Sequence, residues 1–542
     1  MINLRQSFGS SLIQLCVLFV LLVIAREVVH LPGSRGLPAI SLALPLLWFV
    51  AQRDSIDGSR SPFSSASLLL AIAFALALAL RMGMTARSDV LLGYDPGMYK
   101  YLMDTYIGAL PDIAEADLPE WLRQTYPQGL PTLGVVLHLV PGLSPEELMR
   151  YLFPLLMASV VFPVYLLARE VFGSRAAVIS ALLYAVSYTQ LSMFSLTYLK
   201  NGVALFLLPL ALLALHRRSY PLFGLLLGGI AIYHRPTLMV LVICLAFYIL
   251  TTRQRGMIGG FLVALVVALP MFLFRIDVNW ELIRGVLDVS AANLGQQETT
   301  GGGTFFDLET YRWVSLAYQP FAIVGAIHLV RRRLWTLPLL LLLVCAGMVL
   351  LQIAFFRRHI IPLDLAMVLL AGVGIERVFL SGQGRALLRG GVVAALVVGA
   401  AMPTLEQYRE TAPLLTRGQM DAVQWLASET PANAAVVVTS YDAPWALGWS
   451  GRRVIAPGLF QWNLHDNADW QAFLVAGDPQ EVIQFLEPYG SPLYVYHSDQ
   501  QVNYMAYDKF QEPLFRLAYE GEGARIFEYL EYSLKSSTSL ER

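Results

Sequence analysis

A long series of apolar runs constrains this chain more than any other feature. A transmembrane helix needs about 20 mostly apolar residues, and we count thirteen candidate runs. They cover residues 11–31, 37–51, 62–80, 149–167, 176–194, 202–215, 222–233, 237–250, 257–274, 314–330, 334–355, 360–379 and 387–402. Hydrophobic residues make up 56% of the 542 residues and charged residues only 14%, which excludes an ordinary soluble protein. The predicted fold class is mainly α, a polytopic membrane protein with about thirteen transmembrane helices.

Three polar stretches interrupt or follow the apolar runs. Two are loops, 81–148 and 275–313, and the third is the tail 405–542, which has the composition of a soluble domain. Within the tail, periodicity and β-branched runs predict one first helix and four strands, with amphipathic helices between the later strands. The helix is expected at 420–429 and the strands at 434–439, 453–456, 493–496 and 524–528. We therefore predict a transmembrane domain over 1–404 and a small α/β domain over 405–542.

The placement of arginine predicts the orientation in the membrane. The run 11–31 has no small-residue cleavage site, so it is interpreted as an uncleaved anchor. With the N-terminus in the cytoplasm, every short inner loop is basic, as at Arg331–Arg333. This alternation requires 129–140 to be a helix in the outer interface, not a span. The prediction is a multi-pass protein of the plasma (inner) membrane, with both long loops and the tail outside the cytoplasm.

Charge and cysteine content narrow the possible partners and cofactors. The formal net charge is −1, and no basic domain is present, so nucleic acid is not an expected partner. Cys16, Cys244 and Cys345 each lie inside an apolar run, without metal-ligand spacing. We interpret them as small buried hydrophobic residues.

An aspartate follows the third apolar run, near the expected outer surface. The segment 93–99 reads Gly-Tyr-Asp-Pro-Gly-Met-Tyr, with the acid at Asp95. A carboxylate at the interface can act as a general base or a metal ligand. Asp followed by Pro is also a good helix start, with Asp95 as N-cap and Pro96 at the first helical position. The two interpretations are compatible, because a cap determines where the carboxylate points.

This segment resembles the acidic first-loop motif of the C-type (GT-C) superfamily of membrane glycosyltransferases, where an Asp precedes a Pro or small residue and then aromatic residues. Four further stretches resemble the superfamily in order along the chain. They are 126–131 (YPQGLP), 166–173 (LLAREVFG), 228–237 (GGIAIYHRPT) and 357–362 (RRHIIP). The members that the chain resembles include the catalytic subunit of oligosaccharyltransferase, protein O-mannosyltransferases and aminoarabinose transferases.

The resemblance implies an enzyme that transfers a sugar on the outer face of the membrane, with inversion at the anomeric carbon. The donor would be a polyprenyl-phosphate-linked sugar, and the acceptor a glycan, a lipid or a protein. The resemblance also implies that Asp95 activates the acceptor or binds a metal, with Tyr94 and Tyr99 as substrate-binding neighbours. Basic side chains near the outer surface would hold the lipid phosphate, where fixed cations stabilise a leaving group.

One departure from the oligosaccharyltransferase pattern concerns the metal. The stretch 194–202 that matches its second acidic motif contains no carboxylate, and Lys200 stands in its place. Divalent cations need several oxygen ligands, so we expect no metal or other cofactor. The alternative is a divalent metal with Asp95 as one of its ligands. Without a metal, Lys200 would bind the phosphate directly, with Asn201 beside it. The alternative for Lys200 is an interfacial lysine that extends towards water.

Other candidate residues each have a structural alternative. Arg235, Arg357 and Arg358 are candidates for phosphate binding, and His234 for lining the site. The alternatives are a polar turn between two short helices at His234–Arg235, and pairing with anionic headgroups at Arg357–Arg358.

Two acidic positions are candidates for substrate contacts. Glu298 lies in the second outer loop, which would either order over a substrate or stay disordered. Asp442 and Trp445 partly resemble the acceptor-recognition segment of oligosaccharyltransferase, and the alternative is a packed turn in which Asp442 caps a helix.

Two functions of other classes use the same features. A transporter or flippase of lipid-linked glycans would need the basic cavity but no catalytic carboxylate, and a related pair of halves with broken helices would be typical of it. No such halving is visible in the sequence. A non-catalytic scaffold for envelope assembly would use the tail as its interaction module. Replacing Asp95 distinguishes the flippase and the scaffold from an enzyme, because only the enzyme needs this carboxylate for its activity.

Overall fold

The computed structural model describes residues 65–530, apart from 113–115, 141, 253, 255, 354, 381–385, most of 274–303 and most of 502–508. The predicted spans 11–31 and 37–51 and the candidate Glu298 lie outside the described residues. The chain forms two compact units. The larger unit contains the described residues up to Arg87, with Pro127–Gly129 and Leu139–Thr411; the smaller unit contains Ser88–Tyr126, Leu130–His138 and the residues from Ala412 onward.

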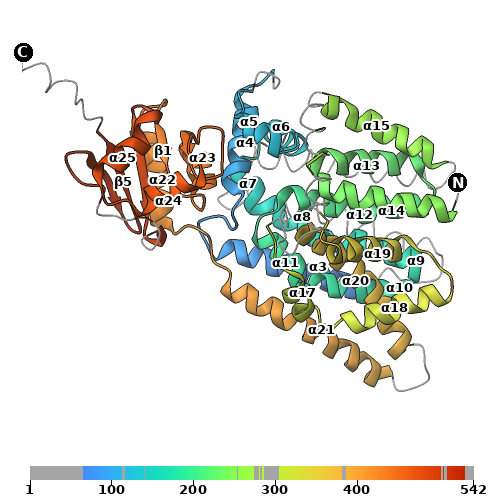
Figure 1. Cartoon of the computed structure of the whole chain (residues 1–542). Coiled ribbons are helices and arrows are strands. Elements are labelled where there is room, and N and C mark those ends of the chain that lie inside the picture. Colours follow the sequence, from blue (N-terminus) through green and yellow to red (C-terminus); the bar gives the residue numbers. More distant parts are fainter. Residues whose placement is uncertain are drawn as a thin grey trace, which may run out of the picture. The chain divides into compact units, whose positions relative to one another are not determined.

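The larger unit is built from helices, several of which lie alongside one another (α12 to α15, green in Figure 1). Its α-helices are α3 (Ser65–Ala86), α7 (Pro145–Glu147), α8 (Phe153–Ser159), α9 (Val161–Phe172), α10 (Ser174–Ala185), α11 (Tyr188–Ser195), α12 (Leu199–His216), α13 (Tyr220–Tyr233), α14 (Arg235–Thr252), α15 (Met257–Leu273), α17 (Leu308–Val314), α18 (Gln319–Arg331), α19 (Leu337–Leu350), α20 (Ile360–Ile375) and α21 (Ala386–Glu410). Short π or 3₁₀ turns occur at η3 (Leu148–Leu152), η4 (Phe356–His359) and η5 (Glu376–Leu380).

Among the described residues, five helices are long and apolar enough to cross a membrane. Two bent pairs, α10 with α11 and α17 with α18, raise the number to seven if each pair is one span. Other predicted runs form shorter apolar helices, such as α13 and α19 with 14 residues each. Each of these is shorter than the ~20 residues that a straight span needs. A mainly helical membrane fold is therefore confirmed, and the count of thirteen spans is not.

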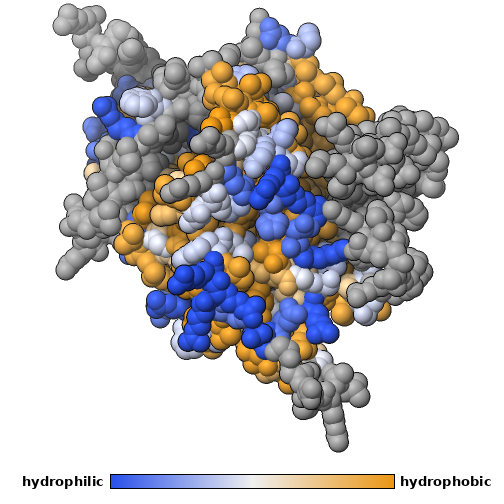
Figure 2. Space-filling model, turned by 90° about the vertical axis from the view of Figure 1, so that its right-hand side faces the viewer, coloured by the Kyte–Doolittle hydropathy of each residue, from blue (hydrophilic) through white to orange (hydrophobic). Residues whose placement is uncertain are grey.

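The outer surface of these helices is apolar where a water-soluble protein would be polar. Leu250 and Val266 are 74% and 72% exposed, and Ile258 is also exposed. Figure 2 shows broad hydrophobic areas beside a band of hydrophilic residues on one face of the molecule. Exposed apolar patches of this extent are typical of a surface that faces another apolar phase, in this case the bilayer.

The smaller unit combines the tail with residues of the first loop. Its helices are α4 (Pro96–Gly108), α5 (Glu120–Thr125), most of α6 (Gly129–Leu139), α22 (Arg417–Glu429), α23 (Ala443–Ser450), α24 (Asn467–Val475) and α25 (Pro479–Leu486), with 3₁₀ turns η6 (Glu487–Tyr489) and η7 (Asp499–Gln501). Its strands are β1 (Ala435–Val437), β2 (Arg453–Ile455), β3 (Leu493–Ser498), β4 (Phe515–Gly521) and β5 (Ala524–Tyr529). The helix predicted at 129–140 is confirmed as α6.

The strands form one sheet in the order β2-β1-β3-β5-β4. The strands β2, β1 and β3 are parallel, and β3, β5 and β4 are antiparallel. The register places Val437 beside Val495, and Val495 beside Phe527, in the buried core that Trp470 and Phe485 also join. The helix and the four strands predicted in the tail are confirmed, whereas β4 was not predicted. The predicted boundary between 404 and 405 stays a prediction, and the observed packing adds first-loop residues to the tail.

Candidate functional site

Four basic side chains gather in the larger unit, and we call them the basic cluster: Lys200, His234, Arg358 and His359. Lys200 is the second residue of α12, His234 directly precedes α14, and Arg358 and His359 end the η4 turn before α20. Burial lowers the pKa of His234 well below its usual value, and the charges of Lys200, Arg358 and His359 lower it further. Three short helix-entry segments, far apart in sequence, thus place cationic groups around one neutral imidazole.

The hydrogen bonds of His234 determine which ring nitrogen carries the proton. The backbone N–H of Thr237 donates to Nδ1 at 3.3 Å, and the Thr237 hydroxyl lies 2.7 Å from the same atom. Because a backbone N–H can only donate, Nδ1 is the acceptor, and the proton of the neutral ring is on Nε2. His234 is 3% exposed, and its Nε2 has no hydrogen-bond partner among the described residues. A buried donor without a partner is costly, and an anion beside the cluster would satisfy it.

Arg358 is held by aromatic and hydroxyl groups that leave part of its guanidinium available. One terminal nitrogen donates to Thr304 Oγ1 at 3.0 Å, and Cζ lies 5.5 Å from the centre of the Tyr198 ring. The Tyr198 hydroxyl donates to the same Thr304 oxygen at 3.1 Å. The turn that presents Arg358 begins at Phe355, whose φ of 63° is unusual for a bulky residue. Thr304 therefore links the end of the loop 275–313 to the basic cluster.

Lys200 and Asn201 lie in the first turn of α12, where backbone N–H groups are free of helical partners. Both side chains are buried, and Lys200 is only 8% exposed. This burial argues against the alternative of an interfacial lysine whose amine extends to water. Arg235 is half-buried as the first residue of α14. The Cζ atom of Arg357 lies 5.9 Å from the centre of the Phe356 ring, and the charge of Arg357 helps to lower the pKa of Asp307. The neighbours of Arg357 in these contacts are therefore not members of the basic cluster.

The smaller unit contains the predicted acidic segment. Helix α4 begins at Pro96 directly after Asp95, as predicted, but the Asp95 carboxylate makes no capping hydrogen bond. Its Oδ2 instead accepts a hydrogen bond from the hydroxyl of the buried Tyr99 at 3.0 Å. Tyr99 thus orients the carboxylate from one helical turn away. The predicted helix start is confirmed, and the predicted capping interaction is not present.

A second aspartate lies near this segment. The Tyr94 hydroxyl donates to the backbone oxygen of Ser440 at 2.6 Å. Burial raises the pKa of Tyr94, and the charges of Asp95 and Asp442 raise it further. Asp442 is buried, precedes α23 without a side-chain capping bond, and accepts from Ser498 Oγ at 3.4 Å. The smaller unit therefore places two carboxylates from distant segments around one tyrosine.

Close helix packing brings these segments together. A Cβ on Gly97 of α4 would overlap the carbonyl oxygen of Pro444 in α23, and a Cβ on Gly448 would overlap Gly97. Trp445 is fully buried and stacks on Trp449 with ring centres 4.9 Å apart. The structure therefore places Trp445 in the packing between helices, while Tyr94 and Asp95 stay partly exposed.

Metal-binding geometry is absent from the described residues. These residues contain no group of three or more His, Cys, Asp and Glu side chains arranged to hold a metal ion. Glu298 lies outside the described residues. The expectation of a metal-free site therefore stays a prediction.

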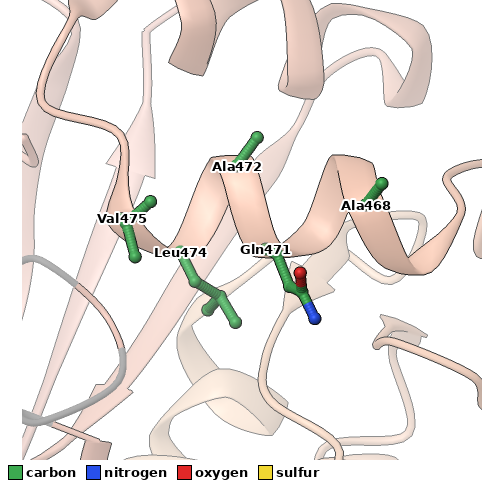
Figure 3. Close-up of a pocket in the computed structure, with 5 residues that line it drawn as sticks. All are labelled: Ala468, Gln471, Ala472, Leu474 and Val475. Carbon is green, nitrogen blue, oxygen red and sulfur yellow. The ribbon is translucent and has the colours of Figure 1, made fainter.

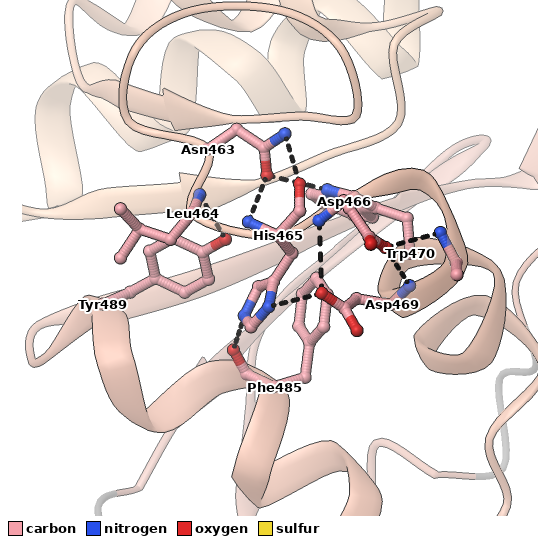
Figure 4. Close-up of polar contacts among 9 residues, drawn as sticks. Asn463, Leu464, His465, Asp466, Asp469, Trp470, Phe485 and Tyr489 are labelled. Atoms are coloured by element: carbon pink, nitrogen blue, oxygen red, sulfur yellow. Dashed lines mark hydrogen bonds and ion pairs between the residues drawn. The ribbon is translucent and has the colours of Figure 1, made fainter.

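Two other features of the smaller unit belong to its packing. An apolar hollow on α24 is lined by Ala468, Gln471, Ala472, Leu474 and Val475 (Figure 3), and it has no charged group for a phosphate. Near it, His465 Nε2 donates to Phe485 O at 2.8 Å, and the His465 ring stacks on the Phe485 ring (Figure 4). Trp470 Nε1 donates to Asn463 Oδ1 at 2.8 Å. These contacts attach α24 and α25 to the loop before them.

The fold resembles that of solved C-type membrane glycosyltransferases, the superfamily that the sequence motifs resemble. Residues 136–280 match the family described as dolichyl-phosphate-mannose-protein mannosyltransferase. Solved structures of the class share the fold over most of this chain. Comparison with curated protein sequences gives no match. The predicted resemblance to the superfamily is confirmed, and the chain is a multi-pass membrane protein.

Two particular proteins of known structure illustrate the likeness. The archaeal oligosaccharyltransferase AglB from Archaeoglobus fulgidus, in complex with an inhibitory peptide and a dolichol-phosphate, has a TM-score of 0.62 and 15% identity, and the match covers 80% of this chain and 69% of AglB. ArnT from Cupriavidus metallidurans in the apo state has a TM-score of 0.58 and 15% identity, and the match covers 86% of this chain and 99% of ArnT. ArnT bound to undecaprenyl phosphate matches with a TM-score of 0.55 and 15% identity over 86% of this chain and 98% of ArnT.

Sequence reasoning found part of the site. It selected Lys200, His234 and Arg358 separately, and the structure places all three in the basic cluster. It missed His359, although the Arg-Arg-His run at 357–359 was a signal. It also missed Thr304 and Tyr198, because a hydroxyl in a loop carries no motif. The roles of all these residues in binding stay predictions.

Proposed function

We propose that the protein transfers a sugar from a polyprenyl-phosphate carrier to an acceptor at the outer face of the membrane. The observation that carries the proposal is the basic cluster, where the buried Nε2–H of His234 lies among Lys200, Arg358 and His359. This combination suits a phosphate, which offers acceptor oxygens and negative charge together. AglB and ArnT, which share the fold, have been solved with dolichol-phosphate and undecaprenyl phosphate respectively.

In the proposed reaction an acceptor hydroxyl or amine attacks the anomeric carbon, and the bond from that carbon to the phosphate oxygen breaks. The carboxylate of Asp95 takes the acceptor proton, and the polyprenyl phosphate leaves with its electron pair. Lys200 and Arg358 stabilise the charge that develops on the leaving phosphate. Tyr99 holds Asp95 through its 3.0 Å hydrogen bond. We assign no metal to the reaction, and Asp442 is proposed as a second polar group near the acceptor.

In the membrane, we propose that the N-terminus lies in the cytoplasm and the smaller unit outside it. The basis is the arginine distribution along the sequence, together with the presence of the acidic segment and the tail in one unit. The carrier is proposed to be a monophosphate, because Lys200 occupies the position of the second acidic motif. The sugar and the acceptor are not specified by the described residues.

The experiment that tests the proposal replaces Asp95 with Asn in protein reconstituted in nanodiscs. Turnover of a panel of radiolabelled polyprenyl-phosphate sugars is measured with and without EDTA. Loss of a general base is expected to lower turnover by about two to four orders of magnitude, while undecaprenyl phosphate still binds. Asp104→Asn is the matched control, because Asp104 is exposed on the same helix and pairs with Lys100 at 2.5 Å.

The possible results separate the functions. Turnover that needs Asp95 and survives EDTA supports metal-free transfer, and turnover abolished by EDTA overturns the metal-free part. The protein is a flippase if the wild type binds polyprenyl phosphate and moves it across the bilayer, Asp95→Asn moves it equally well, and neither protein transfers a sugar. If the wild type binds no polyprenyl phosphate, the proposal is wrong.

A further inference from the structure

A carboxylate is completely buried inside helix α20, one turn after the basic cluster. Asp364 is 0% exposed and lies five residues beyond His359 in the sequence. Taking a carboxylate out of water is costly unless hydrogen bonds satisfy it. Neither the proposed chemistry nor any motif in the sequence accounts for this residue, so its partners are informative.

Four side-chain donors surround the Asp364 carboxylate, two on each oxygen. From the start of α11, Ser187 Oγ donates to Oδ2 at 2.7 Å and Gln190 Nε2 donates to the same atom at 2.9 Å. Tyr311 of α17 and Tyr318, the residue before α18, donate from their hydroxyls to Oδ1, the first at 3.4 Å. The carboxylate is thus saturated, and all four donors come from outside α20.

The segments that meet at Asp364 are those that lead to the basic cluster. Helix α11 continues through a short turn into α12, whose second residue is Lys200. Helix α17 follows directly after the stretch that contains Thr304, the partner of Arg358. Helix α20 begins immediately after His359, and Gln190 Nε2 also donates to the Ile361 carbonyl in its first turn at 3.2 Å.

We infer that Asp364 is a positioning residue that holds α11, α17 and the first turn of α20 together, and thereby sets the arrangement of Lys200, Arg358 and His359. A buried charge with four directional partners permits few alternative packings, which is the specificity that such groups can provide. The part of this inference that concerns the lipid donor rests on the proposed function. The part that concerns the arrangement of the cluster does not.

The first test reads the cluster without any ligand. Full-length protein in nanodiscs is labelled with ¹³C and ¹⁵N in histidine, and the His234 and His359 signals are assigned by single substitution. Asp364→Asn, and the gentler Tyr318→Phe, are expected to shift both signals. The matched control is Tyr184→Phe, which removes an equally buried hydroxyl that donates to the Met157 carbonyl at 3.2 Å. Unchanged signals in folded Tyr318→Phe, or equal shifts in Tyr184→Phe, would overturn the inference.

The second test measures affinity for undecaprenyl phosphate by its protection against thermal unfolding. We expect Asp364→Asn to weaken binding on the order of ten- to a hundredfold, the range seen when supporting groups are displaced. In a double-mutant cycle, Asp364→Asn should cost much less in an Arg358→Gln background, because the two changes affect one binding element. Fully additive losses would overturn the positioning role, since general destabilisation would act independently of Arg358. A wild type that binds no lipid phosphate while the histidine signals still respond would contradict the proposed function and support the structural part.

Discussion

At the scale of single residues, the hydrogen bonds around a side chain determine which of its atoms is available for chemistry. His234 stands in a motif that the sequence already marked, but the N–H of Thr237 decides that Nε2 is the donor. Asp95 stands where a helix cap is expected, and its carboxylate instead accepts from Tyr99. In both cases the sequence predicts the position, and the surrounding structure determines the role.

Two substitutions of His234 separate its cap from its donor. Asn at this position keeps an acceptor for the Thr237 N–H but removes the Nε2–H group, whereas Gln keeps a donor near Nε2 and loses the cap. A hydrogen bond to a charged group contributes about 1.5–3 kcal/mol, so His234→Asn should weaken binding of polyprenyl phosphate by about ten- to a hundredfold at similar stability. Titration of lipid binding and thermal unfolding of both variants provide the measurement.

The pH dependence of the same binding is a further part of this prediction. Burial and the neighbouring cations lower the pKa of His234 well below its usual value. The imidazole therefore stays neutral across physiological pH, and its Nε2–H is present throughout. His234 should contribute no inflection to wild-type binding between about pH 6 and 8, near the ordinary histidine pKa of about 6.5. An inflection in that range which disappears in His234→Asn would contradict the neutral donor.

At the scale of elements, helix starts and helix crossings place the functional groups. Lys200, His234 and Arg358 all lie at the entry to a helix in the larger unit. In the smaller unit, α4 and α23 approach so closely that Gly97 and Gly448 have no room for a side chain. Each crossing depends on residues far apart in the chain, so a local pattern shows the helix but not its neighbour.

Gly97 should therefore resist substitution in a way that another glycine of the same helix does not. A Cβ at Gly97 meets the Pro444 backbone, so Gly97→Ala should destabilise the unit by about 1–3 kcal/mol. Gly108, at the other end of α4, has nothing within 4 Å of an added Cβ, so Gly108→Ala should be neutral or slightly stabilising. Thermal unfolding of the purified variants measures both, and equal midpoints would show that α4 and α23 do not pack as described.

At the scale of the whole molecule, the chain forms two compact units that do not follow its order. The smaller unit takes residues from the first loop and from the tail. The reason is visible in its packing: Met98, Tyr99 and Leu102 of α4 are buried, and α4 lies against α23. The acidic segment is therefore part of the same folded body as Asp442.

The tail by itself should consequently fold poorly. A fragment of residues 412–542 exposes the face of α23 that α4 covers, and burial of apolar surface contributes about 25 cal/mol per Å². We expect this fragment to bind a hydrophobic dye and to unfold at a lower temperature than a fusion of residues 88–126 to the tail. Dye binding and circular dichroism of the two proteins make the comparison. A tail fragment as stable as the fusion would show that the first loop contributes nothing to this unit.

The sequence by itself determined the class of molecule, the outline of the helices, the start of α4 at Pro96, and four of the five strands of the tail. These features depend on composition, on periodicity and on short-range stereochemistry, all of which are local. Strand β4 was missed although Phe515, Leu517 and Tyr519 alternate with other residues along it, and its register with β5 is irregular between Leu517 and Tyr519.

Only the tertiary structure decided which distant groups meet. It brought His359 and Thr304 to the predicted basic residues, placed Asp442 near Asp95 around Tyr94, and surrounded Asp364 with four donors. These arrangements arise from helix packing between segments that are separated by up to several hundred residues. Apolar helices of similar composition can pack in many ways, so hydrophobic patterning predicts that they pack but does not specify which polar side chains are buried together.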